Sequence, residues 1–134
     1  VELLNDVGLY DEDLEVCEDY DLWLRVTCRH KVGLINEKLI IKYAGHENQL
    51  SFKYWGMDRF RVLALEKLLM YELPSETWEL EAFPTSFPSC TWECRQQQIK
   101  QTIIKKYKLL LKGAIKYDKI QDIKTYEDKL KLYE

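Results

Sequence analysis

Three carboxylates, Glu18, Asp19 and Asp21, lie close together in a stretch that also carries Trp23 and Arg25. Such a cluster can do acid–base chemistry, because one carboxylate can hold the backbone at a helix start while another faces a cleft as a general base. The same residues can also form a structural cap, since acidic side chains bond free N–H groups in a first helical turn and oppose the helix dipole. One carboxylate suffices for a cap, so the cap alone does not explain three acids that repel one another.

Cysteine and histidine side chains offer a second kind of chemistry, but their spacing does not favour it. No two of the 4 cysteines form a C-x-x-C pair. His30 and His46 stand in no recognisable zinc spacing with them. We therefore expect free thiols in a reducing compartment rather than disulfides or a zinc site. The cysteines are Cys17, Cys28, Cys90 and Cys94.

The length and composition of the chain are those of one globular domain or a piece of a larger one. Its 134 residues are 46% apolar and 32% charged, which allows one hydrophobic core. The longest apolar runs are interrupted by charge well short of the ~20 residues that a membrane-spanning helix needs. The chain starts at Val1, and residues 1–9 lack the pattern of a secretory signal. We expect a segment of a longer protein.

The net charge of −3 hides an asymmetry along the chain. Residues 1–50 hold 11 acids and 5 bases, whereas residues 92–134 hold 6 acids and 11 bases. The basic part could meet an anionic surface, either a phosphate-bearing substrate or lipid headgroups, or it could be a solvated helix face. We expect no nucleic-acid partner.

A helix must position the acidic cluster. Apolar residues at helical spacing, Leu22, Trp23 and Val26, predict a helix from near Glu18 to near His30. Asp21 and Arg25 stand one helical turn apart, so we expect them to pair. The acidic cluster then lies at the helix N-terminus.

Further elements follow the acidic helix. Residues 32–43 are rich in Val, Ile and Leu around a polar break, which predicts two short strands or a strand and a bend. Ser51 is the expected N-cap of the next helix. Two amphipathic helices come last, one before and one after Gly113. Their apolar positions are Ile99, Ile103, Tyr107, Leu110 and Leu111, then Ile120, Ile123, Tyr126 and Leu130. The predicted fold class is α+β and mostly α-helical, with one short strand pair.

Three motifs resemble, in order and spacing, the C-terminal part of the catalytic domain of family-two glycosyltransferases with the glycosyltransferase A fold. They read V-G-L-Y-D-E at 7–12, C-E-D-Y-D-L-W-L-R at 17–25 and H-E-N-Q-L-S at 46–51. The resemblance covers roughly residues 1–70. It implies that the chain is a C-terminal fragment of a nucleotide-sugar transferase α/β fold with a helical extension.

The resemblance also implies a division of the chain. Residues 1–51 would be the acceptor-side part of the catalytic domain, and residues 52–72 would form a connecting helix. Residues 73–91, which hold all 3 prolines, would be a connector. Residues 92–134 would be a basic helical extension.

The activity implied by the resemblance is inverting transfer of a sugar from a nucleotide sugar to a hydroxyl of a sugar or lipid-linked acceptor, as in polysaccharide biosynthesis. Asp19 matches the family's catalytic base, and Glu18 would support it or contact the acceptor. His46 would lie near the diphosphate. Trp23 could stack on a sugar, with core packing as its alternative. The implied location is the cytoplasm, with the inner membrane surface as an alternative.

The full-length family uses a divalent metal, Mn²⁺ or Mg²⁺, held by an Asp-x-Asp motif after a buried strand. The sequence matches those letters at 11–13 and 19–21, but neither place follows such a strand. Without these ligands nothing holds the ion against the diphosphate. We therefore expect no metal ligands in this chain and no sugar transfer by the chain alone.

A competing interpretation is a non-catalytic helical interaction module in which the acidic cluster is only a cap. It predicts a buried Asp19 with no cleft beside it, whereas a catalytic base should lie exposed at the edge of a concave surface.

In both interpretations the lysines scattered around the last two helices favour solvated packing over a helix lying in a membrane surface. Unpaired strand edges in residues 32–43 favour self-association as a homo-oligomer.

Overall fold

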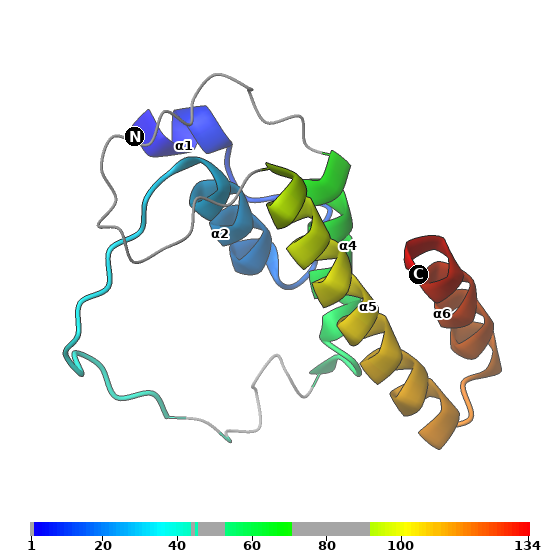
Figure 1. Cartoon of the computed structure of the whole chain (residues 1–134). Helices are drawn as coiled ribbons and strands as arrows, with labels where there is room; N and C mark the ends of the chain where they lie inside the picture. The colour runs from blue at the N-terminus through cyan, green and yellow to red at the C-terminus, as the bar shows by residue number, and fades with distance from the viewer. Residues whose placement is uncertain (1, 44, 46–52, 71–91) are drawn as a thin grey trace. The chain divides into compact units, whose positions relative to one another are not determined.

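A computed structural model of the chain describes residues 2–43, 45, 53–70 and 92–134. It divides into two compact units, Val1–Leu65 and Glu66–Glu134. All regular elements in the described ranges are α-helices (Figure 1). They are α1 (Glu2–Val7), α2 (Glu18–Arg29), α4 (Asp58–Met70), α5 (Trp92–Lys116) and α6 (Ile120–Tyr133).

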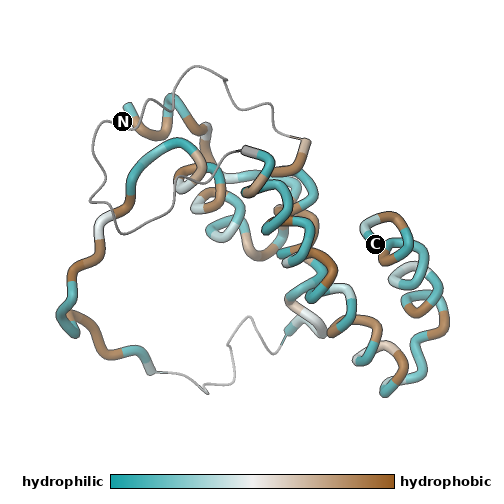
Figure 2. Tube along the Cα trace, viewed as in Figure 1, coloured by the Kyte–Doolittle hydropathy of each residue, from teal (hydrophilic) through white to brown (hydrophobic). Residues whose placement is uncertain are grey.

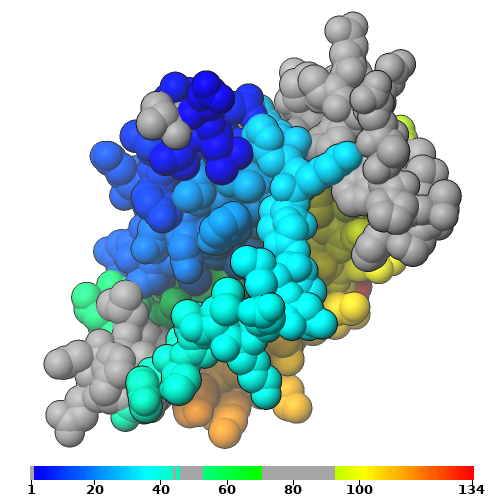
Figure 3. Space-filling model, turned by 90° about the vertical axis from the view of Figure 1, so that its left-hand side faces the viewer, coloured from blue at the N-terminus to red at the C-terminus, as the bar shows by residue number. Residues whose placement is uncertain are grey.

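The prediction of an α+β fold with a strand pair in residues 32–43 is wrong, because the described part of the chain contains no strand. The segment runs as a chain without regular structure that includes several apolar residues (Figure 2). It lies at the surface (Figure 3), and its apolar side chains are exposed. A strand needs a neighbouring strand to pair its backbone N–H and C=O groups, and an isolated pair is marginal in water. The apolar pattern favours a strand, but a strand is stable only where a second strand is present to pair with it.

Helix α2 forms where the sequence predicts it. Its first backbone hydrogen bond runs from the Asp21 N–H to the Cys17 carbonyl at 3.1 Å, and the His30 N–H closes its end on Val26 at 2.7 Å. Leu22 and Val26, one turn apart, are buried in a cluster with Val7 of α1. The helical prediction and its bounds are confirmed.

Trp23 does not join this core, contrary to the predicted apolar face of α2. Its side chain is 56% exposed. Successive helical residues are rotated by about 100°, so Trp23 lies beyond the narrow stripe that Leu22 and Val26 define. The stripe is complete without Trp23.

Asp21 and Arg25 form the predicted ion pair, and the pair joins α2 to the end of α1. The Arg25 Nε donates to Oδ2 of the buried Asp21 at 2.9 Å. The Arg25 Nη2 donates to the Leu9 carbonyl at 2.7 Å, and the Arg25 Nη1 donates to the Val7 carbonyl. Gly8 lies between these carbonyls with φ +81°, and a Cβ there would come within 3.2 Å of Nη1. The Asp21–Arg25 pair therefore links the motif at 7–12 to the motif at 17–25.

A second set of contacts from α2 reaches the C-terminal end of α1 one turn further on. The Arg29 Nη1 donates to the backbone carbonyl of Asp6 at 2.6 Å and to its Oδ1 at 3.2 Å. The His30 Nε2 lies 2.7 Å from the other carboxylate oxygen of Asp6. Basic groups are favourable at a helix C-terminus, where the last carbonyls lack intrahelical partners.

Helix α4 begins at Asp58, later than the helix expected across residues 52–72. It begins there because Gly56, at φ +64°, turns the backbone out of helical geometry. The predicted N-cap Ser51 and the predicted connector 73–91 lie outside the described residues. The boundary between the two units falls within α4, after Leu65.

In the second unit, α5 and α6 form a helical hairpin joined by residues 117–119 (Figure 1). The buried face of α5 follows helical spacing, as predicted, and α6 contributes two buried residues. These residues are Ile103, Tyr107, Leu110 and Ala114 of α5, and Tyr126 and Leu130 of α6. The turn comes after Lys116 rather than at Gly113, and Ile120 is exposed rather than on the apolar face. No described helix is long and apolar enough to cross a membrane.

Glu66, in the C-terminal half of α4, bonds both helices of the hairpin through its mostly buried carboxylate. Its Oε1 accepts hydrogen bonds from the Tyr107 hydroxyl at 2.8 Å, the Lys129 ammonium at 3.0 Å and the Tyr133 hydroxyl at 3.1 Å. Burial and the neighbouring Glu66 carboxylate raise the pKa of Tyr133 to about 12, and the same two causes raise the pKa of Tyr107. Both phenols thus stay protonated as donors.

Glu66→Gln should lower the pKa of Tyr133 from about 12 towards its ordinary value of 10. The substitution removes the negative charge that opposes formation of tyrosinate, while the amide oxygen can still accept a hydrogen bond. Tyrosinate absorbance over an alkaline titration, with Tyr133→Phe identifying the contribution of that residue, measures the change. In the unmodified chain the raised pKa means that the stabilisation is complete below pH 10 and is lost as the pH rises through about 12. An unchanged tyrosine titration in Glu66→Gln would contradict the contact.

Candidate active site

A cleft of about 480 Å³ lies at the N-terminal end of α2 in the first unit. Its walls come from the first turns of α2, the extended segment 31–43 and the start of α4. The residues that line it are Val16, Cys17, Glu18, Asp19, Tyr20, Trp23, Lys42, Met57 and Arg61. Glu18, Asp19 and Trp23, three of the four predicted site residues, therefore meet in one concave surface.

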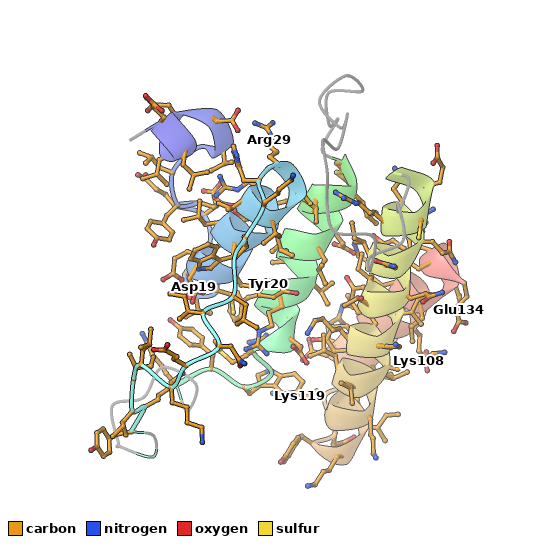
Figure 4. All side chains as sticks on the ribbon, turned by 60° about the vertical axis from the view of Figure 1, so that its left-hand side comes forward. Asp19, Tyr20, Arg29, Lys108, Lys119 and Glu134 are labelled. Carbon is orange, nitrogen blue, oxygen red and sulfur yellow. The ribbon has the colours of Figure 1, made fainter. Side chains whose placement is uncertain are left out.

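The three acids of the cluster have different surroundings. Asp21 is buried and bonded to Arg25, whereas Glu18 is half-buried and Asp19 is exposed at the cleft. Figure 4 shows Asp19 and Tyr20 side by side at the first turn of α2. The Oδ1 of Asp19 accepts the backbone N–H of Tyr20 at 2.7 Å. Its Oδ2 accepts no hydrogen bond from the described part of the chain and is available to a ligand.

Cys17 sets the start of α2 from an unusual backbone conformation. It has φ +66° and ψ +21°, the left-handed region that non-glycine residues seldom adopt, and its side chain does not cap the helix. Its buried Sγ lies 4.0 Å from the Met57 carbonyl oxygen. Burial raises the pKa of the thiol, although the charge of Arg61 opposes the rise. Cys17 is therefore a packed neutral thiol rather than a nucleophile.

Arg61 supplies positive charge to the same cleft. Its Nη1 donates to Asp58 Oδ1 at 3.1 Å, and its guanidinium carbon lies 6.0 Å from the centroid of the Tyr20 ring. The hydrogen bond with Asp58 is the main cause that raises the pKa of Arg61, which keeps the group charged. Burial raises the pKa of Tyr20, so its phenol is neutral. The cleft thus has an acidic edge on α2 and a basic edge on α4.

The sequence interpretation did not identify Lys42 and Arg61 as cleft residues. They lie far along the chain from Asp19 and carry no local motif, so only the folded chain brings them to the cleft. Trp23 was expected in the core or at a sugar, and its exposed ring lines the cleft, so the core alternative is wrong. An exposed aromatic ring beside carboxylates is a suitable wall for a polyhydroxylated ligand.

The remaining predicted site residue, His46, lies outside the described residues. Within the described ranges, no group of three His, Cys, Asp or Glu side chains is placed to hold a metal ion. Asp19 and Asp21 match the letters of a metal motif but do not fit a shared cation, because Asp21 is buried against Arg25.

The chain has no match among family models, curated proteins or solved structures.

Proposed function

We propose that the chain carries the acceptor-side residues of an inverting glycosyltransferase and that Asp19 is its general base. The observation that carries the proposal is the position of Asp19. Of the acids in the cluster, it is exposed at a cleft, has one carboxylate oxygen available to a ligand, and lies beside the exposed ring of Trp23. The three motifs that resemble family-two glycosyltransferases support the same assignment.

The proposed reaction is a single displacement at the anomeric carbon of a nucleotide sugar. As the acceptor hydroxyl oxygen bonds to that carbon, its proton passes to Oδ2 of Asp19, which must lie within about 2.6–3.2 Å of the hydroxyl. The bond from the anomeric carbon to the diphosphate breaks on the opposite face, and the nucleoside diphosphate leaves with the electron pair. Configuration at the anomeric carbon is inverted as a result.

The other cleft residues would bind the acceptor. Glu18 can accept hydrogen bonds from acceptor hydroxyls, and the Trp23 ring can pack against the apolar face of a sugar. Holding the acceptor in place lowers the barrier because the reacting hydroxyl no longer has to be oriented by diffusion. The Asp21–Arg25 pair would act only by fixing the start of α2, since Asp21 is buried.

The alternative function is a non-catalytic helical interaction module. It is favoured by one observation, the hydrogen bond from the Tyr20 N–H to Asp19, which is the contact of a local cap. A cap of this kind does not require a cleft, an adjacent exposed tryptophan or a second acid facing the same space. Asp19 thus has the exposed position that the catalytic interpretation expects and that the module does not need.

The chain by itself is predicted to transfer no sugar. The sequence contains no Asp-x-Asp motif after a buried strand, and such a motif would hold a divalent ion against the diphosphate of the donor. Incubation with a panel of nucleotide sugars and Mn²⁺ should give neither product nor tight nucleotide binding. Turnover in that assay, or nucleotide binding that saturates at micromolar concentration, would show that the donor site is in this chain.

A further inference from the structure

The tip of the α5–α6 hairpin, residues 112–120, presents large apolar side chains to solvent. Ile115, Tyr117 and Ile120 are 59%, 63% and 74% exposed and lie within six consecutive residues. The tip is the end of the hairpin opposite the C-terminus of α6 (Figure 1). Exposed apolar residues scattered singly need no explanation, but three at one tip indicate a surface that is covered by something else.

The tip is held in a defined shape. The Tyr117 N–H donates to the Gly113 carbonyl at 3.1 Å, and the Lys119 N–H donates to the Ala114 carbonyl at 2.9 Å. Ala114, between the exposed residues and the hairpin core, is completely buried. The apolar side chains are therefore presented by a fixed turn, and binding through them requires little ordering of the backbone.

The charge around these apolar residues is positive. Lys112, Lys116 and Lys119 lie within the tip, which holds a single acid, Asp118. Lys112 and Lys116 are exposed and form no ion pair with any residue that the structure describes. The Lys116 ammonium lies 5.4 Å from the centroid of the Tyr117 ring, so a cation and an amphipathic aromatic ring stand together. This combination fits the boundary between anionic headgroups and acyl chains.

We propose that the α5–α6 tip docks on an anionic lipid bilayer. Ile115, Tyr117 and Ile120 enter the headgroup boundary, and the lysines contact lipid phosphates. The hairpin approaches by its tip rather than lying flat, which agrees with lysines scattered all around its two helices. Three apolar side chains form too small a patch for a stable interface with another protein, which usually buries about 800 Å² on each partner. The proposal does not depend on sugar transfer.

Co-sedimentation of the full chain with lipid vesicles tests this docking. The probes are vesicles of phosphatidylcholine alone and vesicles of phosphatidylcholine mixed with phosphatidylglycerol. The chain should bind the mixed vesicles and bind neutral vesicles at least about tenfold more weakly, because each lysine near an anionic surface contributes about fivefold. Added salt should weaken the binding.

Two variants and one matched control separate the tip from the rest of the chain. Ile115→Ser with Ile120→Ser should weaken binding to mixed vesicles by at least about tenfold, because apolar area no longer enters the boundary. Lys112→Gln with Lys116→Gln should weaken it to a similar extent. Leu132→Ser is the control, since Leu132 is 72% exposed but lies at the other end of α6 and should change binding less than about twofold.

Several outcomes would overturn the proposal. They are no binding to mixed vesicles, equal binding to neutral vesicles, and an equal loss in the Leu132→Ser control. A further contradicting result is a dimer, seen by sedimentation without lipid, that Ile115→Ser with Ile120→Ser converts to a monomer, because the tip would then be a protein interface. The helix content measured by circular dichroism should stay unchanged in all variants. If Ile115→Ser with Ile120→Ser lowers the helix content, vesicle binding by the variant with Lys112→Gln and Lys116→Gln tests the docking in its place.

Discussion

Replacing Arg25 with leucine is expected to lower the free energy of unfolding of the chain by about 3–5 kcal/mol, the cost of breaking a buried ion pair from one side. The Asp21 side chain, only 3% exposed, would lose its partner at 2.9 Å. The carbonyls of Val7 and Leu9 would lose their donors as well. Urea unfolding followed by circular dichroism measures the loss, which should appear as a lower midpoint.

Arg29→Leu is the matched control for this experiment. Arg29 lies one turn further along α2 and also bonds the end of α1, but its partner Asp6 is half-exposed. Exposed ion pairs contribute about 0–1 kcal/mol, so the control should lose much less stability. Asp21→Leu with Arg25→Leu should recover part of the loss, because the double change removes the buried carboxylate together with the guanidinium that stabilises its charge. An effect of Arg25→Leu no larger than that of Arg29→Leu would contradict the structural role of the pair.

Helix α2 and the Asp21–Arg25 pair could be predicted from sequence because both depend on local spacing. Leu22 and Val26, four residues apart, define the buried stripe, and an acid and a base four residues apart face each other on any helix. The α5 and α6 helices were predictable for the same reason. Their boundary was missed by one turn, because Gly113 continues α5 and the backbone reverses at Asp118, which has φ +51°.

The strand prediction failed because strands depend on neighbours far along the chain. Residues 32–43 have the composition of a strand, but no described segment pairs with them. The local composition indicates which secondary structure a segment favours, but it does not indicate whether a second strand is present to pair with it. The expected class was therefore wrong even though the helices were predicted correctly.

Only the part of the candidate site that lies on one helix could be predicted. Glu18 and Asp19 lie in one contiguous motif, and their placement at a helix start followed from the spacing of the apolar residues. Lys42 and Arg61 reach the cleft only through the fold of the first unit. The exposure of Trp23 also depends on what covers α2, and helical spacing alone placed it in the core.

Asp19→Asn should reduce sugar transfer about 10²–10⁴-fold in the intact enzyme of which this chain is proposed to be a part, the range that a general base contributes. Asparagine has nearly the same shape, and its amide oxygen can still accept the Tyr20 N–H that Asp19 Oδ1 accepts at 2.7 Å. It cannot take the proton of the acceptor hydroxyl. Urea unfolding should therefore be nearly unchanged while transfer falls. Glu18→Gln is the matched control, because it removes one charge from the same cleft without removing the proposed base.

The most direct measurement is kcat/KM for sugar transfer by the intact enzyme, compared between the unmodified protein, Asp19→Asn and Glu18→Gln. If Asp19 is the general base, Asp19→Asn loses at least about 100-fold, whereas Glu18→Gln loses less than about tenfold, because its amide oxygen can still accept a hydrogen bond from the acceptor. If Asp19→Asn stays within about twofold of the unmodified enzyme, Asp19 is not the base and the cluster is a helix cap.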